Sequence, residues 1–151
     1  MSWSHPAFGD LAQWLGAGTG LAFPPDRLTG VEHGFRRAMK RSGVSDPAQY
    51  LARIKGGGQT LDDLISELTV GETYFFREPS QFCFLREIVL PEILGRRGPD
   101  SILRAWSAGC ASGEEAYSLA ILLTEAGLGG RSSILATDIA RDALAKAERA
   151  S

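Results

Sequence analysis

The sequence predicts an α plus α/β fold, in which a small all-helical N-terminal domain is followed by the first βαβα part of an α/β domain. In the first half, apolar residues repeat at helical spacing between glycine- and proline-containing breaks, with no strand pattern. In the second half, short apolar runs at 102–106 and 134–137 have the length of strands, and a helical segment follows each. This alternation is typical of parallel α/β units.

Four short helices are expected up to residue 68. The first covers 8–15 and is followed by a glycine-rich turn at Gly16, Gly18 and Gly20. Asp26 can cap the second helix, and Gly43 can end it. The buried stripe of this second helix is predicted to consist of Leu28, Val31, Phe35 and Met39.

The third and fourth helices have their own start signals. Asp46 and Pro47 mark the start of the third helix, and the glycines at 56–58 end it. Thr60, with Asp63 three residues later, resembles a capping box for the fourth helix. The apolar residues of that helix repeat at helical spacing: Leu61, Leu64, Ile65 and Leu68. Residues 1–68 are therefore predicted to form one helical domain.

A polar and aromatic connector at 69–78 leads into a linking helix, and 69–98 is interpreted as connector and linking helix. Tyr74, Phe75 and Phe76 of the connector are expected to be core residues, because large aromatic side chains are usually buried. The linking helix carries an apolar series that runs towards Leu94: Phe82, Leu85, Ile88 and Val89.

Residues 99–151 are predicted to belong to one parallel α/β domain. The glycine-bearing segment 107–113 follows the first strand, and a largely apolar helix runs from Glu114 to a stop at Gly127. Asp138 follows the second strand directly. Residues 140–150 are strong helix formers and are predicted to close the unit as a helix.

Composition excludes several classes of protein. The chain has 151 residues, 44% of them hydrophobic, and a net charge of −2, which is ordinary for a globular protein and offers no overall positive charge for nucleic acid. Its two cysteines and two histidines cannot form a cysteine-rich zinc or disulfide framework, so no metal site is expected. No stretch approaches the roughly 18 apolar residues of a membrane span. We therefore expect a cytoplasmic protein without membrane insertion. Cys110 is expected to be a packing residue without a catalytic function.

The charge is nevertheless unevenly distributed. Residues 27–55 contain seven Lys and Arg against two acidic residues. This local excess indicates either an acidic macromolecular partner or simply a solvated helix face. The candidate contact residues are Arg36, Arg37, Lys40 and Arg41.

The loop after the first strand is the candidate ligand site, since parallel α/β units bind ligands outside the carboxyl ends of their strands. Gly109 and Gly113 lie in this loop, and Asp138 is placed to accept hydrogen bonds from the hydroxyls of a ribose. This pattern predicts a nucleoside-containing cofactor. Alternatively, the glycines only turn the chain and Asp138 caps the last helix.

Two cofactors use this topology, NAD and S-adenosylmethionine. The loop lacks the full Gly-x-Gly-x-x-Gly pattern of a dinucleotide site. Glu114 and Glu115 place negative charge at the helix start, which repels a diphosphate but can receive an ammonium group. This favours S-adenosylmethionine, although a nucleotide-dependent oxidoreductase stays open as an alternative.

Three blocks of sequence resemble the CheR-type chemotaxis receptor methyltransferases: 70–77 (VGETYFFR), 106–118 (WSAGCASGEEAYS) and 136–139 (ATDI). The resemblance runs from about residue 11 to the end of the chain. It implies a Rossmann-like methyltransferase domain that transfers a methyl group from S-adenosylmethionine to receptor glutamate side chains and leaves S-adenosylhomocysteine as product.

The resemblance also implies roles for individual residues. Thr73 and Arg77 match cofactor-contacting residues of the connector, Glu114 matches the acid of the first helix, and Asp138 matches the ribose-binding acid. Arg77 is in addition a candidate for orienting the incoming glutamate; alternatively it pairs with Glu78 or Glu87. The basic helix would present its positive charge to the cytoplasmic region of a methyl-accepting chemotaxis receptor.

A complete methyltransferase sheet of this kind needs about as many residues again. We therefore expect 99–151 to be a partial Rossmann-like domain without its C-terminal half, with open sheet edges and little activity alone. The alternative function is a non-catalytic interaction module that binds an acidic receptor or signalling partner through the basic helix.

Overall fold

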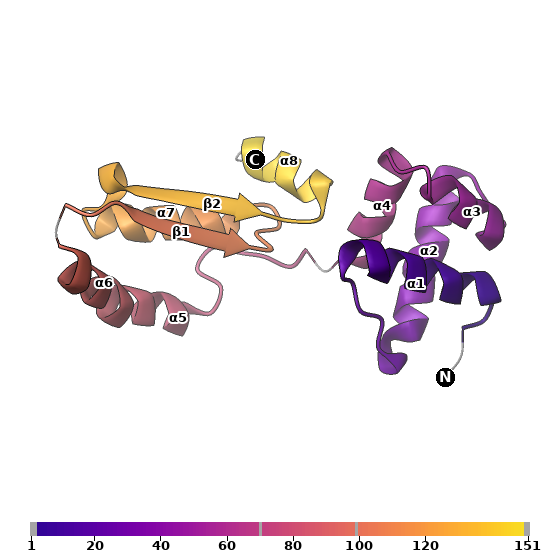
Figure 1. Cartoon of the computed structure of the whole chain (residues 1–151), viewed down its shortest axis with the longest axis horizontal. Helices are drawn as coiled ribbons and strands as arrows, with labels where there is room; N and C mark the ends of the chain where they lie inside the picture. The colour runs from indigo at the N-terminus through magenta and orange to yellow at the C-terminus, as the bar shows by residue number, and fades with distance from the viewer. Residues whose placement is uncertain (1–2, 70, 99, 150–151) are drawn as a thin grey trace. The chain divides into compact units, whose positions relative to one another are not determined.

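The computed structural model describes residues 3–69, 71–98 and 100–149, and the chain divides into two compact units, Met1–Val70 and Gly71–Ser151. Figure 1 shows both units. The predicted connector at 69–98 falls almost entirely within the second unit. Val70 and Pro99, which belong to predicted segments, and Ala150, the predicted end of the last helix, lie outside the described residues.

The first unit consists of helices, as predicted. They are α1 (Pro6–Thr19), the short 3-10 turn η1 (Pro25–Arg27), α2 (Leu28–Ser42), α3 (Pro47–Ile54) and α4 (Gln59–Leu68). Asp46 caps α3 as expected, because its carboxylate accepts hydrogen bonds from the N–H groups of Ala48 and Gln49. Gly43 ends α2 in the left-handed conformation with φ of 71°.

Three local predictions in this unit are wrong. The expected turn at Gly16 and Gly18 is helical, and α1 ends only at Gly20, whose φ is 77° and whose N–H donates to the Gly16 carbonyl. Asp26 lies in η1 and does not cap α2, which begins after Arg27 without a side-chain cap. Thr60 lies inside α4, which begins after Gly58, so Thr60 and Asp63 form no capping box.

The core of the first unit gathers apolar side chains from all four helices. Phe35 lies at its centre, stacked on Phe8 at 5.7 Å and on Trp3 at 5.9 Å between ring centroids. The buried members of this core are Phe8, Leu11, Ala12, Leu15, Phe35, Ala38, Met39, Tyr50, Ile54, Leu64 and Ile65. The predicted stripe of α2 is thus confirmed at Phe35 and Met39.

The second unit combines helices with a small sheet. A continuous helical segment is formed by α5 (Pro79–Phe84), the π-helical turn η2 (Leu85–Val89) and α6 (Leu90–Arg97). It is followed by β1 (Leu103–Ala108), α7 (Glu114–Glu125), the turn η3 (Gly129–Arg131), β2 (Ser132–Thr137) and α8 (Arg141–Arg149). This confirms the predicted βαβα order.

The two strands are parallel neighbours, with Leu103 opposite Ser132 and Ala108 opposite Thr137. One sheet face carries Leu103, Ala105 and Ile134, which pack with residues of α7 and of the α5–α6 segment (Figure 1). On the other face, Trp106 and Leu135 are exposed, at 66% and 61%. The sheet therefore places the carboxyl ends of both strands side by side, and among residues 71–98 and 100–149 no helix covers the face of Trp106 and Leu135.

α7 ends close to Gly127, where the sequence predicted its stop. Gly127, with φ of 74°, follows the last turn of α7, and the Leu128 N–H donates to the Leu123 carbonyl at 2.8 Å.

Across the described ranges of both units, no helix is long and apolar enough to cross a membrane.

Candidate functional site

The loop at 109–113, which we call the glycine loop, is tied to the carboxyl end of β2. The N–H groups of Gly109 and Cys110 both donate to the Thr137 carbonyl, at 2.8 and 3.0 Å. The Ala111 N–H donates to the carboxylate of Asp138 at 2.8 Å. Parallel pairing brings the ends of β1 and β2 together, so residues that are separated by 27 positions form one local structure.

Asp138 holds this local structure with both carboxylate oxygens. One oxygen accepts from the Ala111 N–H and the other from the Ala140 N–H, each at 2.8 Å. The bond to Ala140 also fixes the residue that precedes α8 (Arg141–Arg149), but it does not involve an N–H group of the helix, so the alternative prediction that Asp138 caps the last helix is not confirmed. Each carboxylate oxygen has a second lone pair. The two hydrogen bonds therefore leave acceptor capacity on Asp138 for a ligand hydroxyl.

Two further carboxylates stand at the start of α7. The Ser112 hydroxyl contacts both oxygens of Glu114, at 3.1 and 2.9 Å, and the Ser107 hydroxyl donates to Glu115 at 2.6 Å. Negative charge is favourable at a helix N-terminus. Together with Asp138, these residues surround the glycine loop with carboxylates, which suits a cationic ligand better than a diphosphate.

The two glycines of the loop have different surroundings. Gly109 is exposed with φ of 78°, and no heavy atom lies within 4 Å of the position that a Cβ would take. Its backbone is therefore open to a ligand. Gly113 is buried, and a Cβ there would come within 2.9 Å of the Ala147 Cβ. The close packing of α8 thus explains why a glycine stands at position 113. The predicted contact of Gly113 with a cofactor stays a prediction.

The connector adopts a compact turn with unusual backbone angles. Phe76 and Glu78 have φ of 53° and 59°, in the left-handed region that non-glycine residues rarely adopt. The Arg77 N–H donates to the Tyr74 carbonyl at 3.2 Å. Such strain persists only where surrounding structure holds it, and it is concentrated at functional sites.

The expectation that all three connector aromatics are core residues is wrong for two of them. Tyr74 and Phe75 are each 53% exposed. Only Phe76 packs inwards, with its ring 5.2 Å from the ring of Phe82 in an edge-to-face contact. The left-handed turn at Phe76 points this one ring into the core, and so its two preceding neighbours remain at the surface.

Thr73 and Arg77 lie on either side of this aromatic run. Arg77 donates to the Glu72 carbonyl at 2.9 Å and lies 3.8 Å from the Glu72 carboxylate, and both side chains are exposed. The alternative prediction that Arg77 pairs with an acidic residue is thus correct, but the partner is Glu72 and not Glu78 or Glu87. Exposed ion pairs of this kind contribute little to stability. Arg77 therefore keeps its charge available, and the predicted roles of Thr73 and Arg77 stay predictions.

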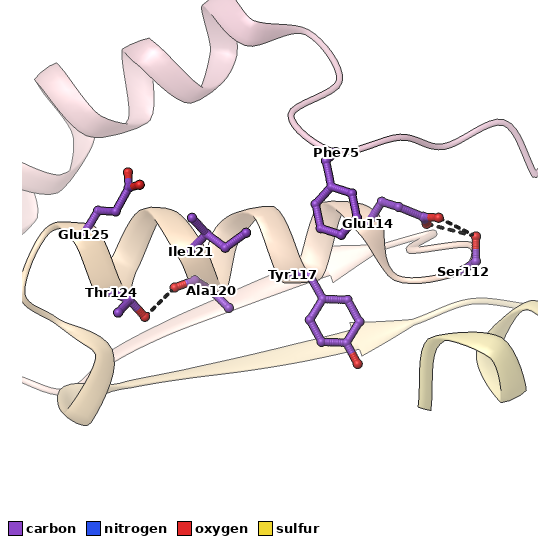
Figure 2. A pocket seen from close by; sticks show the side chains of 8 residues that line it. All are labelled: Phe75, Ser112, Glu114, Tyr117, Ala120, Ile121, Thr124 and Glu125. Atoms are coloured by element: carbon purple, nitrogen blue, oxygen red, sulfur yellow. Dashed lines mark hydrogen bonds between the residues drawn. The ribbon is translucent and has the colours of Figure 1, made fainter. Parts of the chain in front are cut away.

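A groove of about 550 Å³ runs along the outer face of α7. Figure 2 shows Phe75 reaching from the connector towards α7, beside Glu114. Tyr117 and Ile121, both partly exposed, belong to the apolar lining of this groove. Glu114 is the predicted cofactor residue within it, whereas Thr124 and Glu125 lie at the far end of the helix.

Cys110 has the packing role that the sequence indicated. Its side chain is buried, and burial together with the nearby carboxylate of Asp138 raises the pKa of the thiol. A thiol with a raised pKa remains protonated at neutral pH and is a poor nucleophile. The carboxylates of Glu115 and Glu114 act in the same direction, which reflects the negative field around the loop.

Sequence reasoning missed one residue of this site. Ser118 is fully buried in α7, and its hydroxyl joins the helix to the connector. A serine inside a largely apolar helix was the available signal, because a buried hydroxyl needs a hydrogen-bond partner. The partner itself lies 42 positions away in the sequence, so no local pattern identified it.

The basic residues of α2 belong to the first unit, and three of the four have local partners. Arg37 and Arg41 both pair with Glu67, each at 2.7 Å. Arg36 donates to the Ser4 hydroxyl at 3.0 Å and lies 5.0 Å above the Phe8 ring. Among residues 3–69, the side chain of Lys40 makes no hydrogen bond or ion pair.

Glu32 also offsets the charge of Arg36. Burial by itself would raise the pKa of Glu32, but two hydrogen bonds from Ser4 and the charge of Arg36 outweigh burial and lower it. Glu32 is therefore ionised at neutral pH. The positive patch of α2 is consequently smaller than the sequence count of basic residues suggests, and Lys40 is its least compensated member.

Comparison with known proteins identifies the family. The sequence model of the "CheR methyltransferase, SAM binding domain" matches residues 71–151, which is more than half of the chain. The chain belongs to the CheR methyltransferase family. The CheR match covers the whole second unit, with the connector, the glycine loop and Asp138, and it supports binding of S-adenosylmethionine by this unit.

Several curated CheR-type relatives are similar to this chain. A chemotaxis protein methyltransferase of Borreliella burgdorferi is 34% identical over 125 residues, which cover 78% of this chain and 44% of the relative. Chemotaxis protein methyltransferase 2 of Vibrio cholerae is 48% identical over 73 residues, 48% of this chain and 25% of the relative. A chemotaxis protein methyltransferase of Listeria innocua is 41% identical over 93 residues, 60% of this chain and 34% of the relative. The matched regions thus span less than half the length of each of these relatives.

Proposed function

We propose that this chain binds S-adenosylmethionine at the glycine loop and takes part in methyl transfer to glutamate side chains of chemotaxis receptors. The observation that carries the proposal is the placement of Asp138. Its carboxylate closes the loop between the ends of two parallel strands, where α/β domains bind nucleoside cofactors. The names of the relatives support chemotaxis as the setting of the reaction.

The residues present fit such a cofactor. Asp138 retains acceptor capacity for ribose hydroxyls, Gly109 leaves the loop backbone open, and Glu114 offers a carboxylate for an ammonium group. When bound, S-adenosylmethionine supplies a methyl group on a cationic sulfonium. The surrounding carboxylates favour positive charge at this place.

The proposed reaction demands positioning more than acid–base chemistry. A glutamate carboxylate is already ionised at neutral pH, so its attack needs no general base. The contribution of the chain is then to orient the two reactants and exclude water. We assign the orientation of the incoming carboxylate to Arg77, whose exposed guanidinium can form two parallel hydrogen bonds with a carboxylate.

Isothermal titration of the chain with S-adenosylhomocysteine, the product, tests the proposal. We expect saturable binding at one site per chain, and no binding of NAD in a parallel titration. Transfer of labelled methyl groups to a soluble cytoplasmic receptor fragment, measured with S-adenosylmethionine, tests the substrate. A folded chain that binds neither S-adenosylmethionine nor its product would contradict the proposal.

We further propose that Lys40 is the main contact of the first unit with an acidic receptor surface. Within residues 3–69 its ammonium group has no hydrogen bond or ion pair, and it lines a surface depression of about 310 Å³ at the end of α2. The same contact would also serve the alternative function, a non-catalytic interaction module. In that case the chain would bind the receptor without binding the cofactor.

Charge reversal at Lys40 gives a specific prediction. Lys40→Glu should weaken binding of the receptor fragment by about threefold to tenfold at low salt, with the difference shrinking as salt is raised. Lys146→Glu in α8 is the matched control, because it changes the net charge equally at another exposed lysine. Equal affinities of the two variants, measured by titration at several salt concentrations, would rule out Lys40 as the contact.

A further inference from the structure

Ser118 makes a hydrogen-bonded bridge between α7 and the connector. Its side chain is fully buried, with 0% exposure. The hydroxyl donates to the Glu114 carbonyl at 2.6 Å and accepts from the Phe76 N–H at 2.9 Å. One hydroxyl therefore satisfies a carbonyl of the helix and an N–H of the connector at the same time.

The bond to Phe76 holds one of the two connector residues that have a positive φ, the other being Glu78. Phe76 has φ of 53°, and this conformation persists only if neighbouring structure holds it. The Ser118 hydroxyl holds the backbone of Phe76, and the contact with Phe82 holds its ring. The connector is thus fixed to α7 at Phe76, between the two predicted cofactor residues Thr73 and Arg77.

An ordinary core serine would not need this arrangement. A helical serine or threonine can satisfy its hydroxyl with the carbonyl four residues earlier, as Thr124 does with Ala120 at 2.7 Å (Figure 2). Ser118 makes the same bond to Glu114 and additionally receives the connector N–H. The second bond is long-range, and Glu114 on the helix is itself a predicted cofactor residue.

We propose that Ser118 is a positioning residue of the cofactor site. It fixes the connector relative to the first turn of α7, so that Thr73 and Arg77 on one segment and Glu114 on the other stand in a constant arrangement. This inference rests on the proposed function, because it assumes that these residues bind S-adenosylmethionine. It predicts that cofactor affinity depends on a side chain that does not itself touch the cofactor.

The test compares the full chain with three variants in two measurements. Titration with S-adenosylhomocysteine gives the affinity, and amide hydrogen exchange at Phe76 reports whether the bridge is present. Ser118→Ala should expose the Phe76 amide to exchange and weaken binding by about tenfold, since it removes one buried acceptor. Thr124→Ala, the matched control, removes the same kind of intrahelical bond and should change neither quantity.

Ser118→Thr retains the hydroxyl. We expect this variant to protect the Phe76 amide from exchange and to bind S-adenosylhomocysteine as the wild type does. Affinity is thus expected to follow Phe76 protection across all variants that circular dichroism shows to be folded. A Ser118→Ala chain that binds as tightly as the wild type overturns this inference and leaves the proposed function intact. Absence of binding by the wild-type chain overturns both. A fall in affinity that Ser118→Thr does not reverse despite a protected Phe76 amide also overturns it.

Discussion

Replacing Asp138 with alanine is expected to reduce the affinity for S-adenosylhomocysteine by about 100-fold or more. The carboxylate accepts hydrogen bonds from the N–H groups of Ala111 and Ala140, and it is also the proposed acceptor for the ribose hydroxyls. The alanine variant loses all of these acceptors at once. Ala111, which has φ of 46°, would also lose the bond that holds its left-handed conformation.

Two further variants separate the contributions of Asp138. Asp138→Asn keeps the volume and one acceptor oxygen but turns a donor towards the second N–H, so an intermediate affinity is expected. Asp142→Ala removes an exposed acid in the first turn of α8 and should bind as the wild type does. Calorimetric titration gives the affinities, and circular dichroism shows whether each variant is folded. Unchanged binding by a folded Asp138→Ala chain would exclude Asp138 from the site.

The sequence predicted those parts of the second unit that depend on local patterns. Strands and helices alternate because short apolar runs and helical repeats are separated by turn residues, and the structure confirms this order. Asp138 could be placed at the site because parallel strands align their carboxyl ends. The same alignment of strand ends places the glycine loop beside Asp138.

The remaining features depend on contacts between distant residues. Positive φ at Phe76 has no signal in the residue type, so the exposure of Tyr74 and Phe75 could not be predicted. The bridge from Ser118 to Phe76 joins residues 42 positions apart, and Glu67 pairs with Arg37 across 30 positions. Periodicity cannot identify such partners, because it reports which face of an element is buried and not what lies opposite.

This limit matters for the charged helix α2. The sequence named four basic residues as candidate contacts, whereas in the structure Glu67 pairs with two of them and Glu32 and Ser4 hold a third. Reversing Arg37 would therefore disturb an ion pair within the unit as well as any partner contact. Lys40 is the position where the two effects can be separated.

Phe35→Ala is expected to destabilise the first unit by about 3–5 kcal/mol. Phe35 is fully buried and stacks on Phe8 and Trp3, so its removal leaves a cavity in the centre of the core. Small domains are only marginally stable. A loss of about 3–5 kcal/mol approaches the whole free energy of unfolding that is expected for a unit of about 70 residues. Urea unfolding followed by far-UV circular dichroism should show an early loss of helix.

Phe84→Ala is the matched control for this prediction, since it removes the same side chain from a position that is 57% exposed. Phe84→Ala should lower the free energy of unfolding of its own unit far less than Phe35→Ala lowers that of the first unit. The proposed cofactor residues all lie within 71–151, a unit with a separate core. Phe35→Ala should therefore unfold the helical unit and still bind S-adenosylhomocysteine. If binding disappears together with the helices of the first unit, the cofactor site depends on that unit and does not reside in the second unit alone.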